Sequence, residues 1–430
     1  MPTEQKTAEK VQYSAQSFRK QLFQTRELSS SLAAPLSDED QVVQSAIYAS
    51  PTKWHLAHTS WFFEAFILSR YLKGYVRFNE DFEYCFNSYY NSVGERHPRP
   101  IRGLLTRPGA QEVRNYRLYV DEHLHQLLNQ YEDYVPAELA ELIALGINHE
   151  QQHQELLLTD ILTVFAVNPL RPAYKNPAPR EVDMSFVELS WKSFDGGLVD
   201  IGYDGTGFSY DMEGPVHKHY MPPYKLANRL VTNGEWLEFI EDGGYDTVSL
   251  WLDDGWSIVQ SEGWKTPLYW ERKDDSWFKM SLRGLQPVDP NAPVAHVSYY
   301  EADAFSKWAG KRLPTEFEWE LAARNVPVTG NTLGSGAIRP LPAVPGADQD
   351  LLQVFGDVWE WTQSPYTPYP GFQPTADAVG EYNGKFMSNK YVLRGGSCAT
   401  PDGHIRSTYR NFFCPEERWQ FKGLRLAESS

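Results

Sequence analysis

Apolar residues recur at three- and four-residue spacing through the first part of the chain, which is the period of helices that bury one face. This pattern predicts four helices, over residues 9–32, 52–72, 110–134 and 136–165. Gly74 and Pro136 stand where a helix end and a helix start are expected. Four successive helices of this length predict an all-α antiparallel four-helix bundle.

An aromatic and basic loop, FNSYYNSVGERHPRPIRGLLTRP, separates the second and third predicted helices. It covers residues 86–108, far more than a bundle turn requires. Long ordered loops usually carry function, so we expect binding or catalytic residues here.

The pattern changes after Phe165, at the proline-rich segment NPLRPAYKNPAPREV. The remainder is punctuated by Gly, Trp and Pro, and only residues 298–308 and 315–324 show a helical period. We therefore expect an irregular α+β second domain. The predicted boundaries are 1–170 for the bundle, 171–185 for a linker and 186–430 for the second domain.

Composition narrows the class of protein. A chain of 430 residues is long enough for two domains, and 14% aromatic residues can line cores and pockets. Its 56 acidic against 40 basic residues give a net charge of −16, which would repel a nucleic-acid backbone. No apolar run reaches the ~18–20 residues of a membrane helix, and MPTEQKTAEK lacks the apolar run of a signal peptide. We expect a cytoplasmic protein with small-molecule partners and no membrane contact; the oligomeric state stays open.

Two histidines in the fourth predicted helix have metal-ligand spacing. In NHEQQHQELL, His149 and His153 lie at i and i+4, on one face of a helix. HEQQH also matches the HExxH motif of zinc proteases, with Glu150 as the base. That reading needs a third ligand nearby, and only Glu155 and Asp160 follow soon after. The alternative to a metal site is a solvated polar helix face.

Further histidines occur in the second predicted helix, where KWHLAHTSWFFE contains His55 and His58. Facing helices of a bundle can combine one histidine with a pair on another helix. Three imidazoles with open positions suit a divalent transition metal that still binds substrate. A single histidine such as His58 is nevertheless often a packing residue.

With these motifs the chain resembles a known family. KWHLAHTSWFFE and HEQQH resemble the DinB-like domain of the EgtB-like sulfoxide synthases of ergothioneine biosynthesis. LVDIG, YKLANRLVTNGEWLEFI, KRLPTEFEWELAAR, GDVWEWT and RGGSCATPDGHIRSTYRNFF resemble the formylglycine-generating, sulfatase-modifying fold, which is C-type-lectin-like. The copper-binding cysteines of formylglycine-generating enzymes would fall near Thr400 and Ile405, so we do not expect that chemistry.

The resemblance implies a non-haem iron enzyme. Fe(II) would be held by His58, His149 and His153, with His55 beside them. The implied reaction joins cysteine to hercynine with O2 and gives hercynylcysteine sulfoxide. Tyr89 or Tyr90 would supply a proton, with Tyr366 and Tyr369 in reserve; the alternative is that both loop tyrosines serve packing.

The resemblance also implies substrate contacts, which fall on both halves of the chain. Gln152 and Asn411 would contact hercynine, and Phe412 and Phe413 would also bind substrate. Arg96 and Arg99 would bind the carboxylate of the thiol substrate; the alternative is that they are solvated loop charges. Relatives that use γ-glutamylcysteine carry an Asp where this chain has Phe413, which favours free cysteine.

Four alternatives remain open at this point. The chain could be a selenoneine-type synthase, a γ-glutamylcysteine-using synthase, a DinB-type thiol transferase, or a non-enzymatic ligand-binding or scaffold protein with a relic metal site.

Overall fold

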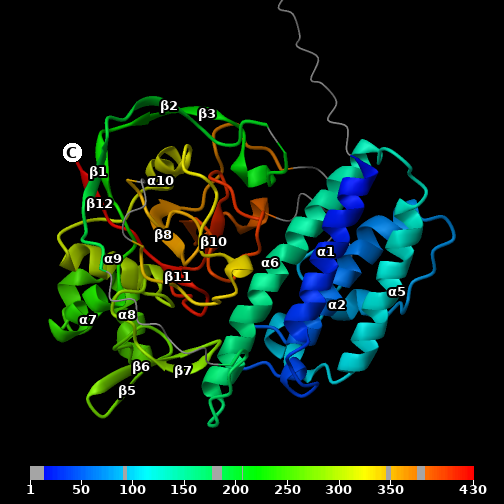
Figure 1. The fold of residues 1–430 in the computed structure, drawn as a ribbon, viewed down its shortest axis with the longest axis horizontal. Helices are drawn as coiled ribbons and strands as arrows, with labels where there is room; N and C mark the ends of the chain where they lie inside the picture. Colours follow the sequence, from blue (N-terminus) through cyan, green and yellow to red (C-terminus); the bar gives the residue numbers. More distant parts are fainter. Residues whose placement is uncertain (1–13, 91–93, 177–185, 206, 345–349, 375–382) are drawn as a thin grey trace, which may run out of the picture. The chain divides into compact units, whose positions relative to one another are not determined.

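The computed structural model describes residues 14–90, 94–176, 186–205, 207–344, 350–374 and 383–430 (Figure 1). The chain divides into two compact units. Unit 1 consists of Met1–Val43, Ser50–Ser88 and Gly94–His153, and unit 2 of Gln44–Ala49, Tyr89–Val93 and Gln154–Ser430. Part of the predicted linker lies outside the described residues, so the predicted domain limits stay a prediction.

Unit 1 is helical, as predicted. Its main helices are α1 (Ala15–Ala33), α2 (Thr52–Phe63), α5 (Ala110–Leu128) and the part of α6 (Ala137–Val167) up to His153. A π-helical turn, η2 (Glu64–Leu68), and α3 (Ser69–Tyr71) extend α2. Shorter elements are η1 (Asp40–Val42), α4 (Phe82–Phe86) and η3 (Arg99–Leu104).

The main helices pack as their apolar patterns predict. In Figure 1, α1, α2 and α5 lie side by side, and α2 contacts both others. Phe18 and Leu22 of α1 and Val113, Val120 and Leu124 of α5 are buried. The structure thus confirms the helical N-terminal fold, although α5 ends at Leu128 rather than at residue 134.

One glycine controls how closely α6 approaches α2. A Cβ atom at Gly146 would lie 2.6 Å from Cε1 of Phe63 and 3.1 Å from Cε1 of Phe62. A methyl group there would therefore push the two helices apart. Gly146 stands three residues before His149 and His58 lies on α2, so this close approach brings the histidine-bearing segments together.

The described residues of unit 2 form four small sheets. The orders are β1–β4–β12, β10–β9–β8–β11, β2–β3 and β5–β6–β7. The strands are β1 (Trp191–Phe194), β2 (Gly197–Ile201), β3 (His217–Met221), β4 (Tyr224–Ala227), β5 (Trp270–Lys273), β6 (Ser276–Ser281), β7 (Gly284–Pro287), β8 (Trp359–Pro365), β9 (Tyr391–Arg394), β10 (Asn411–Phe413), β11 (Lys422–Gly423) and β12 (Ala427–Ser429). The strand β10 pairs with β9 and places Asn411 opposite Leu393.

The helices of unit 2 are α7 (Asn233–Glu241), α8 (Asp253–Glu262), α9 (Tyr299–Trp308) and α10 (Glu316–Ala323), with short turns η4 (Asp211–Glu213), η5 (Val248–Leu250), η6 (Leu333–Ser335) and η8 (Gly384–Phe386). The sequence predicted α9 and α10 but missed α7 and α8. Length does not explain this difference, because α7 and α8 have nine and ten residues while α9 and α10 have ten and eight. The capping box of Thr232 and Glu235 is the signal that marks the start of α7.

The core of unit 2 includes Leu226, Trp319 and Phe355. Trp359 and Trp361 are also buried, which fits the packing role expected of these aromatic residues. Among the described helices, none combines the length and the apolar character needed to span a membrane.

Candidate metal centre

Three histidines of unit 1 converge in the structure. Each of His58, His149 and His153 offers a ring nitrogen, and these atoms all lie within 4.8 Å of one another. Nε2 of His58 lies 3.1 Å from Nε2 of His149. His58 and His149 are buried, whereas His153 keeps some exposure. The expected ligand set therefore exists as a cluster in space.

Hydrogen bonds orient two of these rings. Nδ1 of His58 lies 2.6 Å from the carbonyl oxygen of Phe86, and since a carbonyl only accepts, Nδ1 donates and Nε2 keeps its lone pair. Nδ1 of His153 lies 2.8 Å from Nδ1 of His55. Nε2 is therefore the nitrogen of His153 that is available to a metal ion. His55 thus contacts a ring of the cluster rather than joining it.

The electrostatics of the cluster fit a divalent metal. Burial, the largest cause, lowers the pKa of His149 to about 3. Burial first, then neighbouring histidines, lower the pKa values of His58 and His153 well below the usual range. All three imidazoles are therefore neutral near pH 7, and neutral imidazole is the form that binds transition metals.

The carboxylate of Glu150 is held by ion pairs and hydrogen bonds, which argues against its role as the base of a zinc protease. Glu150 is buried, and its carboxylate accepts hydrogen bonds from Arg26 (Nη1, 3.0 Å), Ser29 (Oγ, 2.6 Å) and Arg117. Although burial raises its pKa, Arg117 and Arg26 outweigh this and lower it to about 2. A carboxylate held by two guanidinium groups is a poor general base at neutral pH.

Glu155 and Asp160, the acidic residues that follow the histidine pair on α6, lie in unit 2 and have partners there. Glu155 accepts hydrogen bonds from Trp359 (Nε1, 2.9 Å), Thr400 (Oγ1, 2.6 Å) and Ser397 (Oγ). Asp160 accepts one from Nε1 of Trp419 at 3.0 Å. Neither residue belongs to the histidine cluster.

The candidate tyrosines belong to an aromatic row of unit 2. The ring of Tyr89 lies 4.7 Å from that of Tyr90 and 5.4 Å from that of Phe386. The ring centroids of Phe386 and Phe412 lie 5.9 Å apart, and Phe412 stacks on Tyr366 with a centroid distance of 4.2 Å. The row therefore connects Tyr89 and Tyr90 to Tyr366, the reserve candidate, and to Phe412, a predicted substrate contact. Both lie over 270 residues away from the loop tyrosines in the sequence.

The remaining reserve candidate, Tyr369, has a different environment. Its hydroxyl lies 3.1 Å from Nη2 of Arg394 and 3.4 Å from Oε2 of Glu316. Burial, the largest cause, raises the pKa of Tyr369 well above the usual range. We therefore regard Tyr369 as part of a structural ion cluster.

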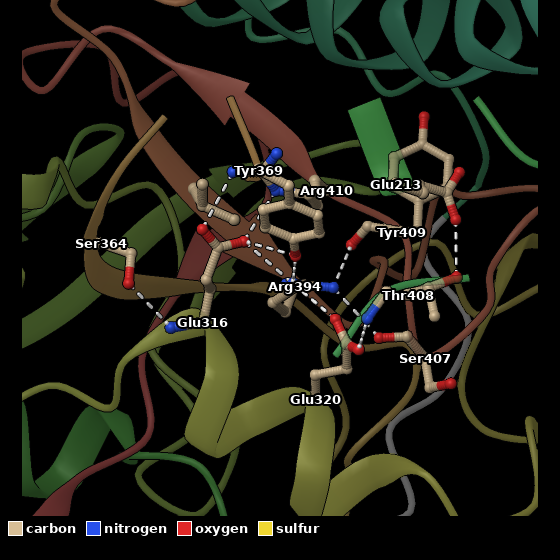
Figure 2. Close-up of polar contacts among 12 residues, drawn as sticks. Glu213, Glu316, Glu320, Ser364, Tyr369, Arg394, Ser407, Thr408, Tyr409 and Arg410 are labelled. Carbon is tan, nitrogen blue, oxygen red and sulfur yellow. Dashed lines mark hydrogen bonds and ion pairs between the residues drawn. The ribbon is translucent and has the colours of Figure 1, made fainter. Parts of the chain in front are cut away.

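That ion cluster consists of Glu316, Glu320, Tyr369, Arg394 and Arg410 (Figure 2). Arg410 binds Glu316 through Nε (2.8 Å) and Nη2 (3.0 Å), and Arg394 binds both carboxylates. All four charged side chains are buried. Paired guanidinium and carboxylate groups thereby fix the chain at Arg410, immediately before β10.

The other predicted substrate contacts differ in exposure. Arg96 and Arg99 are exposed, and Nη1 of Arg96 donates to the carbonyl oxygen of Ser88 at 2.7 Å. Gln152 and Asn411 are half-buried. The structure brings Phe412 to the aromatic row, and the binding roles of these residues stay predictions.

Phe413 packs on a residue that the sequence analysis missed. Nζ of Lys422 lies 3.7 Å from the ring centroid of Phe413. The same Nζ lies 5.0 Å from the ring centroid of Trp361 and 5.2 Å from that of Trp419. Lys422 is fully buried, and its Nζ donates to the carbonyl oxygen of Glu417. The segment FKGLRLA gives no period from which this position could be inferred.

Comparisons with known proteins follow the same two-part division. Residues 21–157 match the DinB superfamily, and residues 192–430 match the sulfatase-modifying factor enzyme 1-like domain. The chain is 36% identical to the hercynine oxygenase of Mycobacterium tuberculosis, over 66% of this chain and 71% of that protein.

Two further relatives are also similar in sequence to this chain. Identity to the hercynine oxygenase of Mycolicibacterium thermoresistibile is 32%, over 77% of this chain and 78% of the relative. The formylglycine-generating enzyme of Thermomonospora curvata is 28% identical, over 54% of this chain and 93% of its own length.

Proposed function

The chain belongs to the EgtB-like hercynine oxygenase family, and from this premise we propose that it is an Fe(II)-dependent sulfoxide synthase that joins cysteine to hercynine. The observation that carries the proposal is the convergence of His58, His149 and His153 in the DinB-like unit. Three neutral imidazoles leave positions open for substrates on a six-coordinate ion.

The proposed reaction consumes hercynine, cysteine and O2 and yields hercynylcysteine sulfoxide and water. A C–H bond of the imidazole and the S–H bond of the thiol are lost, and a C–S bond and an S–O bond form. The two hydrogens leave with the second oxygen atom as water. Bound iron would supply the activation of O2 and a common centre for thiolate and imidazole.

The protein's own groups would bind and orient the substrates. In this proposal His58, His149 and His153 hold the metal, and Phe86 and His55 fix the rings of His58 and His153. Orientation of both substrates at one centre converts an encounter of two molecules into a step within one complex.

The proposed proton donor is the phenol of Tyr89 or Tyr90. Support for this choice comes from the aromatic row that links Tyr89 through Phe386 to Phe412. A phenol within hydrogen-bond reach of reduced oxygen can donate a proton to it.

The proposed substrate contacts are Gln152, Asn411 and Phe412 for hercynine, and Arg96 and Arg99 for the cysteine carboxylate. A quaternary ammonium prefers aromatic faces, and the row around Phe412 offers several. The exposed guanidinium groups of Arg96 and Arg99 can form paired hydrogen bonds with a carboxylate.

A reconstitution tests the proposal. The purified protein is loaded anaerobically with Fe(II), and hercynine is added with cysteine, γ-glutamylcysteine or a selenosugar before O2 is admitted. We expect mass spectrometry to find hercynylcysteine sulfoxide with cysteine. A selenium-containing product alone would indicate a selenoneine-type synthase, and iron binding without any coupled product would refute the proposed reaction.

A further inference from the structure

The loop of residues 86–108 contains a third arginine, Arg102, whose environment differs from that of Arg96 and Arg99. Arg102 is 2% exposed, whereas the other two are exposed. Its Nη1 donates to Oγ of Ser50 at 2.9 Å and its Nη2 to Oγ of Ser88 at 3.1 Å. A buried guanidinium in a loop requires a reason other than solubility.

The guanidinium of Arg102 lies against a tryptophan. Its Cζ is 3.4 Å from the ring centroid of Trp54, close enough for a cation–π contact with ring stacking. Both side chains are buried, which strengthens such a contact because water does not screen it. Arg102 therefore restrains the plane of the indole ring.

The same indole stacks on a member of the histidine cluster. The rings of Trp54 and His58 lie 4.6 Å apart and are 13° from parallel. Trp54 and His58 are one turn apart on α2 and donate to consecutive carbonyl groups: Nε1 of Trp54 to Cys85 at 3.1 Å, and Nδ1 of His58 to Phe86 at 2.6 Å. The orientations of the two rings are thus coupled.

Arg102 also holds the segment that supplies those carbonyl groups, because Ser88 follows Phe86 by two residues. One side chain thereby restrains both the indole that covers His58 and the segment that fixes its tautomer. We propose that Arg102 is a positioning residue of the metal centre, which acts through Trp54 to keep Nε2 of His58 directed at the other two histidines.

This proposal rests on the proposed metal site but not on the reaction. Its test is therefore metal binding without substrates. The affinity of the full chain for Co(II) is measured by competition with a chelator, together with the visible absorption of the bound ion. Arg102→Met retains the length of the side chain but removes its charge and planar fork.

We expect Arg102→Met to weaken Co(II) binding by about 10–100-fold, the range found when an outer partner of a metal ligand is lost, and to alter the absorption spectrum. Arg102→Lys keeps the charge without the planar fork, so it should restore part of the affinity. Arg107→Met is the matched control, since Arg107 is an exposed arginine of the same loop whose Nη1 donates to Thr106. It should bind Co(II) like the wild type.

A double-mutant cycle with Trp54→Leu separates positioning from general destabilisation. If Arg102 acts through the indole, the second substitution adds little to the loss caused by the first. Additive losses, or wild-type affinity in folded Arg102→Met, would overturn the proposal. Should Arg102→Met fail to fold, wild-type affinity and an unchanged spectrum in Arg102→Lys would overturn it instead. Failure of the reaction with intact Co(II) binding would count against the proposed function alone.

Discussion

Unit 1 and unit 2 each bury a cluster of polar side chains, but the two clusters are balanced differently. In unit 2, Glu316 and Glu320 are paired with Arg394 and Arg410, so charges of both signs meet inside the protein. In unit 1, three neutral imidazoles face one another. Paired charges neutralise one another, and removal of one partner would leave a buried charge uncompensated, whereas three converging lone pairs provide a site for a cation.

Glu150 shows that the difference does not follow the boundary between the units. It lies next to His149 on α6, yet it is paired with Arg26 and Arg117 like the carboxylates of unit 2. Adjacent residues of one helix thus serve different purposes because they point to different neighbours. The comparison predicts that substitutions in the histidine cluster abolish function and those in the ion clusters reduce stability.

The largest expected effect is that of removing a ligand. His58→Ala, His149→Ala and His153→Ala should each reduce turnover by more than about 100-fold, because even outer partners of ligands contribute about 10–100-fold. His55→Ala should retain iron. Metal analysis and a turnover assay measure both effects. Stoichiometric iron in a folded variant that lacks both His149 and His153 would show that the ligand assignment is wrong.

Breaking the ion cluster of unit 2 should have the reverse effect. Glu316→Ala leaves Arg394 and Arg410 buried without their shared carboxylate, which should lower the free energy of unfolding by about 3–5 kcal/mol. The iron content of the remaining folded protein should not change. Denaturant unfolding and metal analysis provide the measurements.

The control for Glu316→Ala is Asp200→Ala, which breaks an exposed pair with Lys218. Its effect should stay below about 1 kcal/mol, because solvent screens such pairs. If Glu316→Ala lost iron but kept its stability, the two clusters would not differ in the way proposed.

The sequence was sufficient for those features that depend on local spacing. Periodicity predicted the helices of unit 1, and the spacing of His149 and His153 placed both on one helix face. Spacing alone could not predict contacts between distant residues: Glu150 meets Arg26 from 124 residues away, and Lys385 meets Tyr89 from 296 residues away. Arg102 and Lys422 were missed for the same reason, since their environments are formed only by the folded chain. His58 was assigned to the pair on α6 through the family resemblance, and the structure places the three histidines together.

The loop tyrosines should behave differently from both clusters, because a proton donor should affect the reaction rate but not the stability or the metal content. If Tyr89 or Tyr90 is the donor, its Phe variant should bind iron and both substrates but lose about 100-fold or more in C–S bond formation. Product yield and thiol oxidation are followed by mass spectrometry. Tyr366→Phe serves as the comparison within the aromatic row. Unchanged rates in both loop variants and in their double variant would exclude the loop tyrosines.

The choice of thiol should show a smaller effect. If Phe413 stands at the position where an Asp would pair with a glutamyl amino group, as the family resemblance implies, kcat/KM for cysteine should exceed that for γ-glutamylcysteine by about 10-fold or more. A carboxylate in Phe413→Asp would lie within reach of Lys422, which would neutralise it. The double variant Phe413→Asp, Lys422→Met should therefore narrow the preference more than Phe413→Asp alone. A wild-type preference for γ-glutamylcysteine would contradict this role of Phe413.

Lys422 of unit 2 differs from both clusters, because its buried amino group contacts aromatic rings and a carbonyl group. Burial, the largest cause, lowers its pKa to about 7, although Glu417, Cys414 and Glu416 raise it and Lys390 lowers it further. Below pH 7 the lysine is charged in both the folded and the unfolded chain, so the folded state carries the full cost of burial. Between pH 7 and the ordinary pKa of about 10.4, the unfolded chain binds the extra proton, and stability rises with pH.

Removing this charge should therefore stabilise the protein most at low pH. We expect the difference in unfolding free energy between Lys422→Met and the wild type to favour the variant at pH 6, and to shrink by on the order of 1 kcal/mol at pH 9. Denaturant unfolding of both proteins at the two pH values measures the change, with Lys218→Met as an exposed lysine control. A difference that does not vary with pH would mean that Lys422 keeps its proton throughout, and that the aromatic rings stabilise its charge as effectively as the carboxylates of the ion cluster stabilise Arg394 and Arg410.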